Sequence, residues 1–286
     1  MRYFIDKEVS VAEISKNLKL PIIGNTEQEI KKIGSLTSNG KGTLKFASKK
    51  GLPFIDGIVV GFESQEADTL LVSENPRLDF CRVLNYLINA DLLVEENLKS
   101  TISESATVAS SAVIENNVIV GDNSIIEANV VIHSGSIIGS DCIIRAGSVI
   151  GSQGFGFEQK EDSTWLRFPH LGRVIVHDNV EIGALNSVCI GALDNTVIYS
   201  GVKTDNLVHI AHNCKVGSNS ILTACTELSG GVTLGRSVWM GPNSSVLQKI
   251  NIGDHAMVGI GSVVTKDVAA FHTVAGVPAK IIKRGS

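Results

Sequence analysis

Aliphatic residues recur at every sixth position through most of the chain. The first series occupies Ile102, Val108, Ile114, Val120, Ile126, Ile132, Ile138, Ile144 and Ile150. The phase resumes at Val176, Ile182 and Val188, slips once, and then runs through Ile210, Val216, Leu222, Leu228, Leu234, Met240, Val246, Ile252, Val258 and Val264. A period of six fits neither an amphipathic helix nor a simple alternating strand, and it is typical of a parallel β-helix.

In such a solenoid each hexapeptide forms one short strand and one corner, and its aliphatic side chain points into a three-sided prism. Three hexapeptides make one coil, so we expect residues 18 positions apart to stack on one face. Roughly eight coils fit between about residue 100 and residue 267. Glycine often follows the inward residue, as at Gly121 and Gly217. We expect glycine there because corners need backbone angles that glycine adopts without strain.

Residues 1–100 lack this period and predict a small α/β domain. Ser10 and Glu13 form a capping box at the start of a short helix. Asn75 and Pro76 start a second helix that runs to about Ile88, with asparagine as N-cap and proline at the first helical position. Three strands are expected, at Thr43–Ala47, Gly57–Phe62 and Thr69–Val72.

Two segments depart from the solenoid pattern. Residues 151–173 form an ejected loop, about 20 residues too long for a coil, within the predicted β-helix of residues 101–267. Long loops that leave a regular scaffold are usually functional. Residues 268–286 are expected to cap the open end of the solenoid.

Composition narrows the classes of protein. The 286 residues carry a formal charge of −4, spread evenly, which argues against nucleic acid or an anionic membrane as the main partner. No apolar run approaches the roughly 18 residues that span a bilayer, and the first ten residues lack the core of a secretory signal. Five widely spaced cysteines without a CxxC pair favour reduced thiols and a cytoplasmic protein.

Two of the seven histidines, His209 and His212, stand close together in the solenoid. Ile210 holds the inward phase, so His212 falls at a corner and points outward, where an imidazole can serve as a general base. Gly230 lies 18 residues further on, and its N–H would stand about 5 Å away, in a position to stabilise an oxyanion. The alternatives are a solvated surface histidine and a glycine that merely turns a corner.

A zinc site shared between subunits is a further alternative, since histidines at solenoid corners can bind this metal. His209 and His212 occupy different parts of the hexapeptide, and no third histidine falls one coil away at either phase. We therefore predict no metal site. Phosphate-binding motifs of the GxxxxGKS and GxGxxG types are absent, as is a GxSxG elbow.

A set of motifs resembles the UDP-3-O-acylglucosamine N-acyltransferase family of lipid A synthesis. The matching segments are Gly42–Phe46, Asn75–Pro76, Gly154–Phe157, Pro169–Val174, Val180–Ala184, Gly191–Asp194, Asp205–Asn206 and Ile210–Asn213. They occur in the order of the family and nearly at its spacing, and they cover most of the chain.

This resemblance implies a left-handed parallel β-helix and a homotrimer with active sites between neighbouring subunits. By position, His212 matches the general base of the family and Gly230 its oxyanion-hole amide. Phe46 matches an aromatic residue that stacks on uracil, although its residue type alone favours a core position. The resemblance places the GFGF loop beside the sugar pocket, and the predicted substrate-binding residues are Phe46, Phe155, Gly156, Phe157, Asp205, Asn206, His209 and Asn213.

The C-terminal segment departs from the family. The helices that engage acyl carrier protein in the family are missing, and Val274–Lys280 instead resembles the tail of hexapeptide acyltransferases that use acyl-CoA. Gly276, Lys280 and Lys283 are therefore the predicted donor-binding residues, with the two lysines near the phosphates of the donor.

The sequence thus predicts an N-acyltransferase that moves an acyl group from a thioester to the amine of a nucleotide-linked amino sugar. Acyl-CoA as donor and a surface polysaccharide as destination are favoured, and Asp205 or Asn206 is expected to orient the base. One alternative is lipid A synthesis with a hydroxyacyl carrier protein. Others are a zinc-dependent trimer like carbonic anhydrase and a non-catalytic scaffold that binds nucleotide sugars. No permanently bound cofactor is expected.

Overall fold

The computed structural model describes residues 2–284, which divide into two compact units. The first unit comprises the chain up to Glu96 together with Gly156–Leu171. The second comprises Asn97–Phe155 and the chain from Gly172 onward. Most of the loop that the sequence ejects from the solenoid therefore folds with the first unit.

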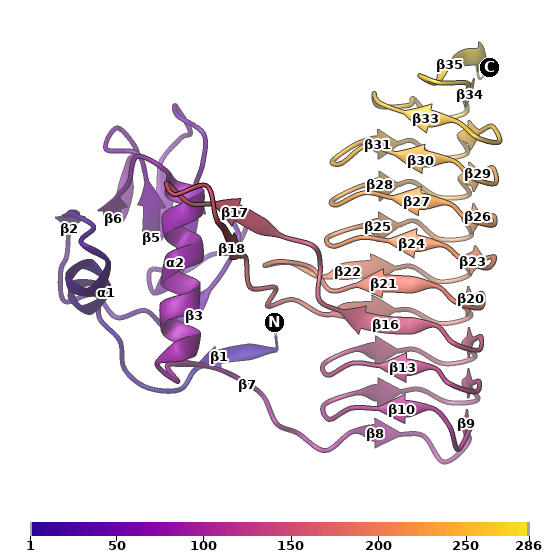
Figure 1. Ribbon diagram of the computed structural model, residues 1–286, viewed down its shortest axis with the longest axis horizontal. Coiled ribbons are helices and arrows are strands. Elements are labelled where there is room, and N and C mark those ends of the chain that lie inside the picture. The colour runs from indigo at the N-terminus through magenta and orange to yellow at the C-terminus, as the bar shows by residue number, and fades with distance from the viewer. Residues whose placement is uncertain (1, 285–286) are drawn as a thin grey trace. The chain divides into compact units, whose positions relative to one another are not determined.

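The first unit contains a five-stranded sheet of order β2-β6-β5-β4-β3, in which β2 alone is antiparallel to its neighbour (Figure 1). Its strands are β2 (Ile22–Gly24), β3 (Lys32–Ile33), β4 (Thr43–Ala47), β5 (Ile55–Gly61) and β6 (Ala67–Val72). Two antiparallel pairs complete it, β1 (Tyr3–Ile5) with β7 (Leu93–Glu95), and β17 (Phe157–Gln159) with β18 (Trp165–Arg167). The helices are α1 (Val11–Leu18) and α2 (Pro76–Asn89).

Both helices begin where their capping residues predict. The hydroxyl of Ser10 accepts a hydrogen bond from the Glu13 N–H at 3.2 Å, and the side chain of Asn75 accepts one from the Leu78 N–H at 3.3 Å. Helix α2 buries a face that includes Phe80 and Leu84. The prediction of strand β4 is confirmed residue for residue, whereas the short strands β2 and β3 were not predicted.

The second unit is a β-solenoid made of three sheets whose strands are parallel except for the last strand of the third sheet, and this confirms the predicted mainly β fold class (Figure 1). The first sheet contains β10 (Val113–Ile114), β13 (Val131–Ile132), β16 (Val149–Ser152), β21 (Ser187–Cys189), β24 (His209–Ile210), β27 (Glu227–Leu228), β30 (Ser245–Val246) and β33 (Val263–Val264). The second contains β8 (Thr101–Ile102), β11 (Ile119–Val120), β14 (Ile137–Ile138), β19 (Val174–Val176), β22 (Thr196–Ile198), β25 (Lys215–Val216), β28 (Thr233–Leu234) and β31 (Asn251–Ile252). The third contains β9 (Thr107–Val108), β12 (Ile125–Ile126), β15 (Ile143–Ile144), β20 (Glu181–Ile182), β23 (Lys203–Thr204), β26 (Ile221–Leu222), β29 (Trp239–Met240), β32 (Met257–Val258), β34 (Thr273–Ala275) and β35 (Lys280–Lys283).

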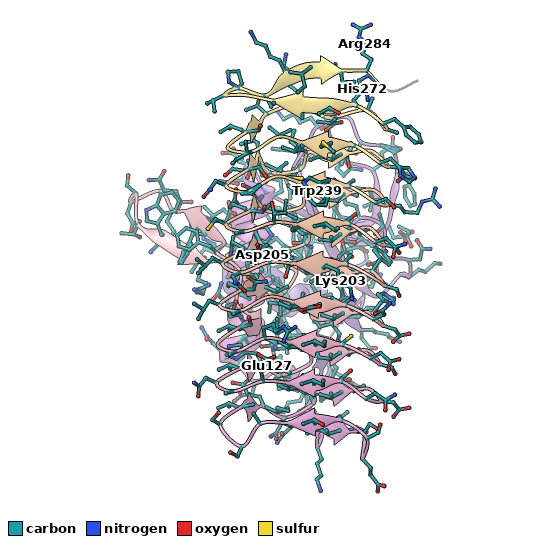
Figure 2. The ribbon with its side chains drawn as sticks, turned by 90° about the vertical axis from the view of Figure 1, so that its right-hand side faces the viewer. Glu127, Lys203, Asp205, Trp239, His272 and Arg284 are labelled. Carbon is teal, nitrogen blue, oxygen red and sulfur yellow. The ribbon has the colours of Figure 1, made fainter. Side chains whose placement is uncertain are left out.

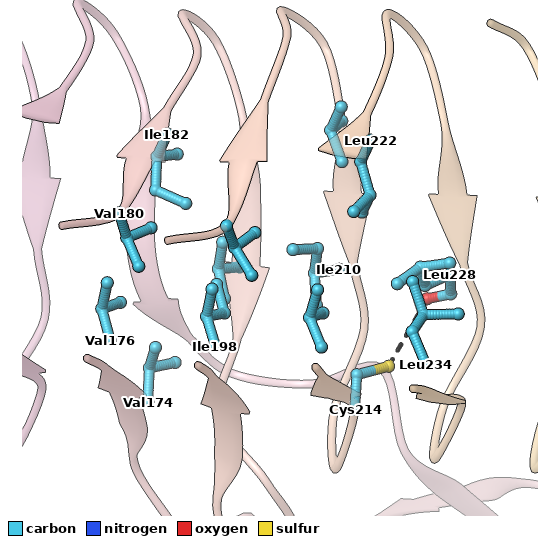
Figure 3. Packing of buried hydrophobic residues seen from close by; sticks show 14 of the residues in the cluster. Val174, Val176, Val180, Ile182, Ile198, Ile210, Cys214, Leu222, Leu228 and Leu234 are labelled. Atoms are coloured by element: carbon cyan, nitrogen blue, oxygen red, sulfur yellow. Dashed lines mark hydrogen bonds between the residues drawn. The ribbon is translucent and has the colours of Figure 1, made fainter. Parts of the chain in front are cut away.

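Strand register follows the predicted repeat. Ile210 pairs with Leu228, and Leu228 pairs with Val246, each 18 residues further on. The inward side chains of all three sheets together form one buried column along the solenoid, and Figure 3 shows Ile198, Ile210 and Leu222, one from each sheet, within it. Burial of each such side chain contributes about 1.5–3 kcal/mol, which explains why the aliphatic period persists over so many coils.

The predicted reason for glycine after the inward residue holds at Gly151, whose φ is 88°, but it is wrong at Gly121 and Gly217. Neither Gly121 nor Gly217 adopts a left-handed backbone conformation; instead, a Cβ atom at Gly217 would lie 2.2 Å from the carbonyl oxygen of Gly235. Glycine is needed there because successive coils approach closely. Left-handed conformations fall two residues later in the corner, often on asparagine, as at Asn213 and Asn219.

The C-terminal segment continues the third sheet. Strand β34 pairs in parallel with β32, and β35 folds back against β34 as an antiparallel strand. Val268 and Val274 extend the buried column. A cavity of about 350 Å³ lies at this end, lined among others by Val268, Pro278 and Lys280.

Candidate active site

The solenoid brings His212 and Gly230 together. Ile210 in β24 is buried, so the chain turns a corner directly after it and His212 lies on the outer edge with a half-buried side chain. A Cβ atom built on Gly230 would lie 2.6 Å from both Cε1 and Nε2 of His212. The imidazole therefore occupies the space that any side chain at position 230 would fill, as the predicted one-coil spacing requires.

Some corner amides equivalent to that of Gly230 have a side-chain acceptor, and others do not. The equivalent N–H groups two residues after an inward aliphatic side chain donate to side-chain oxygens at 2.8 to 3.0 Å at Ser134, Ser140, Ala146, Ala184 and Arg236. For Gly230, as for Ala128, Ser218 and Ala224, no acceptor is found among the residues that the structure describes. An N–H without an acceptor in the chain can donate to the oxyanion of a reacting carbonyl.

The side chain that contacts the second imidazole nitrogen is Asn213. Its Oδ1 lies 3.0 Å from Nδ1 of His212. Asp205 and Asn206 were predicted to orient this ring, but within the chain they sit on the preceding corner, where Asn206 Oδ1 accepts from the Ala184 N–H at 2.8 Å. Figure 2 shows Asp205 on the outer surface of the solenoid, next to Lys203 of β23. That Asp205 or Asn206 orients His212 stays a prediction.

His209 lies in β24 with its side chain outward, in register with Ser187 of β21 and Glu227 of β27. Since Ile210 points inward, His209 and His212 belong to different parts of the same coil. No group of three histidine, cysteine, aspartate or glutamate side chains arranged to hold a metal ion is found within residues 2–284.

In the first unit, Phe46 belongs to an aromatic cluster that the sequence did not reveal. Its ring centroid lies 4.8 Å from that of Phe80 in α2 and 6.4 Å from that of Phe168. Phe80 and Phe168 are buried, whereas Phe46 is only partly covered and keeps some accessible surface. The sequence feature that could have indicated this cluster is the aromatic residue Phe168 in the ejected loop.

The GFGF residues divide between the two units. Phe155 is the last residue of the segment Asn97–Phe155 of the solenoid unit. It is 88% exposed. Gly156 and Phe157 belong to the first unit, where a Cβ on Gly156 would lie 2.6 Å from Cε1 of His170. Phe157 in β17 pairs with Arg167, whose guanidinium lies 4.9 Å from the Phe157 ring centroid.

The predicted donor-binding residues lie at the C-terminal end of the solenoid. The Gly276 N–H donates to the hydroxyl of Ser262 at 3.1 Å, and Gly276 has a left-handed backbone with φ of 101°. Lys280 and Lys283 are the first and last residues of β35, and both are exposed. They present positive charge to solvent beside the C-terminal cavity, which Lys280 lines.

The cysteines are all free thiols. Burial raises the pKa of Cys81 to about 12 and that of Cys214 to about 12, so both thiols stay protonated at neutral pH. Neither thiol has the low pKa that a nucleophilic cysteine requires.

Comparison with known proteins identifies the family of this chain. The chain is 41% identical to the UDP-3-O-acylglucosamine N-acyltransferase of Campylobacter curvus over 276 residues, 87% of this chain and 86% of that protein. The chain belongs to the UDP-3-O-acylglucosamine N-acyltransferase family. This confirms the resemblance found in the sequence, and the predicted enzyme class, a sugar N-acyltransferase, agrees with it.

Other matches to this family are shorter. The enzyme of the same name from Dechloromonas aromatica is 52% identical over 79 residues, which is 28% of this chain and 22% of that protein. The bacterial transferase hexapeptide model (six repeats) matches residues 117–152.

Solved structures support the same fold. The UDP-N-acetylglucosamine acyltransferase of Francisella novicida is 26% identical with a TM-score of 0.52, over 64% of this chain and 67% of that one. The Bacteroides fragilis enzyme, 22% identical with a TM-score of 0.50 over 63% of this chain and 73% of that one, shows the fold alone. In the described part of the chain, neither helix has the length and apolar character needed to cross a bilayer.

Proposed function

We propose that this chain transfers an acyl group from an acyl thioester to the amine of a UDP-3-O-acylglucosamine. The observation that carries the proposal is the His212 imidazole lying directly over Gly230, in a member of this family. The comparisons favour this lipid A reaction, the alternative of the sequence prediction, over acylation for a surface polysaccharide.

The reaction needs only groups that these two residues supply. The amine nitrogen attacks the thioester carbonyl carbon while Nε2 of His212 takes a proton from the amine. The carbonyl oxygen becomes an oxyanion, which accepts a hydrogen bond from the Gly230 N–H. The tetrahedral intermediate then breaks its C–S bond, and the thiolate takes the proton from the imidazolium. The products are an amide and a free thiol.

The expected rate contributions are consistent with this division of roles. General base catalysis typically supplies about 10²–10⁴-fold. One oxyanion donor supplies about 10²–10³-fold. Neither term requires a metal ion or a covalent enzyme intermediate.

For the acceptor, the proposal assigns the nucleobase to Phe46. Its partly exposed ring, backed by Phe80 and Phe168, offers an apolar face on which a flat base can stack. Phe155 and Phe157 are assigned to the sugar and its acyl chain, and Asp205, Asn206 and His209 to the polar groups of the acceptor. These assignments rest on the motif positions.

For the donor, Lys280 and Lys283 present two positive charges on an exposed strand. They suit the phosphates of coenzyme A and equally the acidic surface of an acyl carrier protein. We propose a hydroxyacyl carrier protein as the donor, on the strength of the family, and assay both donors.

The test is a thiol-release assay of the purified protein with UDP-3-O-acylglucosamine and either a 3-hydroxyacyl carrier protein or an acyl-CoA. We expect thiol release that depends on the amino sugar, with an N-acylated product detected by mass spectrometry. His212→Ala should lower kcat about 10²–10⁴-fold and change KM for the sugar little. Absence of product with both donors, or an unchanged kcat in His212→Ala, would refute the proposal.

A further inference from the structure

The hexapeptide phase shifts between Val188 and Ile198, and this shift changes the course of the backbone beside the candidate site. Val188 and Ile198 both point inward but lie ten positions apart, so the coil contains four extra residues between β21 and β22. Gly191 makes the extra turn tight, because a Cβ there would lie 1.7 Å from the carbonyl oxygen of Asp194. Gly172 closes over the same oxygen, at 2.3 Å from an equivalent Cβ. The turn of residues 191–195, which accommodates these four extra residues and is called the inserted turn below, is therefore compact and has a fixed backbone.

This turn forms hydrogen bonds with both the oxygen and the nitrogen of the Asn213 side-chain amide. The Ala192 N–H donates to Oδ1 of Asn213 at 2.9 Å, and Nδ2 of Asn213 donates to the Asp194 carbonyl at 3.3 Å. A backbone N–H can only donate and a carbonyl can only accept, so the two partners fix which end of the amide is oxygen. The backbone N–H of Asn213 also donates, to Oγ1 of Thr196 at 2.9 Å.

The orientation of Asn213 sets the protonation of His212. Oδ1 lies 3.0 Å from Nδ1 of the imidazole, and an amide oxygen can only accept. Nδ1 of the neutral ring must therefore carry the proton, which makes Nε2 the basic nitrogen. Nε2 is also the nitrogen beside Gly230.

We propose that Asn213, which is hydrogen-bonded to the inserted turn of residues 191–195, is a positioning residue that holds His212 in the Nδ1-protonated tautomer. This inference rests on the proposed function of His212 as the base. It also reassigns Asn213, because its side-chain amide is occupied by backbone partners and by the imidazole rather than directed to a substrate.

The backbone conformation at Asn213 determines which substitutions can be used to test the proposal without strain. Its φ of 62° is left-handed, a region that glycine, asparagine and aspartate tolerate. Asn213→Gly removes the side chain without strain, and Asn213→Asp keeps an acceptor oxygen for Nδ1. Asn243→Gly is the matched control, since Asn243 is exposed, has a φ of 54° and lies on a different corner.

The experiment combines kinetics with nitrogen NMR of protein labelled with ¹⁵N-histidine, and His212→Gln identifies the His212 resonances. We expect the wild-type spectrum to show a proton on Nδ1, and Asn213→Gly to lose this preference. In Asn213→Gly, kcat should fall about 10–100-fold with KM for the sugar within about threefold. Asn213→Asp should recover most of kcat, and Asn243→Gly should match the wild type.

The two readouts separate the two proposals. If no acyl transfer is detected but the tautomer shifts in Asn213→Gly, the proposed function fails while the positioning by Asn213 holds. A wild-type ring protonated on Nε2, or an Asn213→Gly variant with wild-type tautomer and kcat, would overturn the inference.

Discussion

At the scale of single residues, the candidate site depends both on the imidazole of His212 and on the lack of a side chain at Gly230. Gly230 gives the imidazole of His212 its space and also presents an amide without an acceptor among the described residues. The sequence predicted the pairing through the 18-residue offset, whereas the contact of Asn213 with the ring depended on the fold.

We predict that Gly230→Ala lowers kcat about 10²–10³-fold, since the new methyl group would stand 2.6 Å from the imidazole and force it away from the amide. The solenoid itself should remain folded, because a corner side chain points outward. Steady-state kinetics and circular dichroism before and after the substitution test this. A variant with full turnover would show that the imidazole need not lie over position 230.

At the scale of secondary-structure elements, strand β4 carries a charge in the interior of the first unit. The Lys45 side chain is fully buried, and its Nζ lies 2.5 Å from Oδ1 of Asp56 in β5. The other oxygen of Asp56 accepts from the Gly40 N–H at 2.8 Å. The hydrogen bond from Lys45, followed by that from Gly40, lowers the pKa of the Asp56 carboxyl. The pair joins β4 to β5 and to the turn before β4.

A lowered folded-state pKa means that this stabilisation is present above the ordinary aspartate value of about 3.9 and is lost as pH falls through the folded value. We predict that Asp56→Asn lowers the melting temperature at pH 7 because it leaves a buried ammonium group without its counter-charge. The gap to the wild type should narrow below about pH 4. Melting curves from pH 7 to pH 3 measure this, and equal melting temperatures at pH 7 would contradict it.

At the scale of the whole molecule, the first coils of the solenoid present aliphatic side chains to solvent. Val113, Ile119 and Ile125 project outward from three different sheets and are 53%, 44% and 40% exposed. Outward apolar residues on the faces of a regular scaffold are typical of a surface that is covered by another protein chain. Because these three residues lie on three different faces, they do not form one patch, and the homotrimer is expected from the family resemblance.

We therefore predict a mass of about three times 30.3 kDa in light scattering after size-exclusion chromatography. Ile119→Glu should weaken the assembly. Lys215→Glu serves as its control, because it places the same carboxylate at an already polar position of the same sheet. A wild-type protein of monomer mass at micromolar concentration would rule out the trimer.

The sequence by itself determined the features that repeat or that are encoded over a few neighbouring residues. Each hexapeptide carries its own inward side chain, so the solenoid and its 18-residue register follow directly from the period, and the caps at Ser10 and Asn75 mark the helix starts. The tertiary structure decided what depends on residues far apart in the chain. It assigned Gly156–Leu171 to the first unit, buried Lys45 against Asp56, and brought Ala192 to Asn213 across a coil. No local pattern records such contacts, because each is made only when two distant segments close on each other.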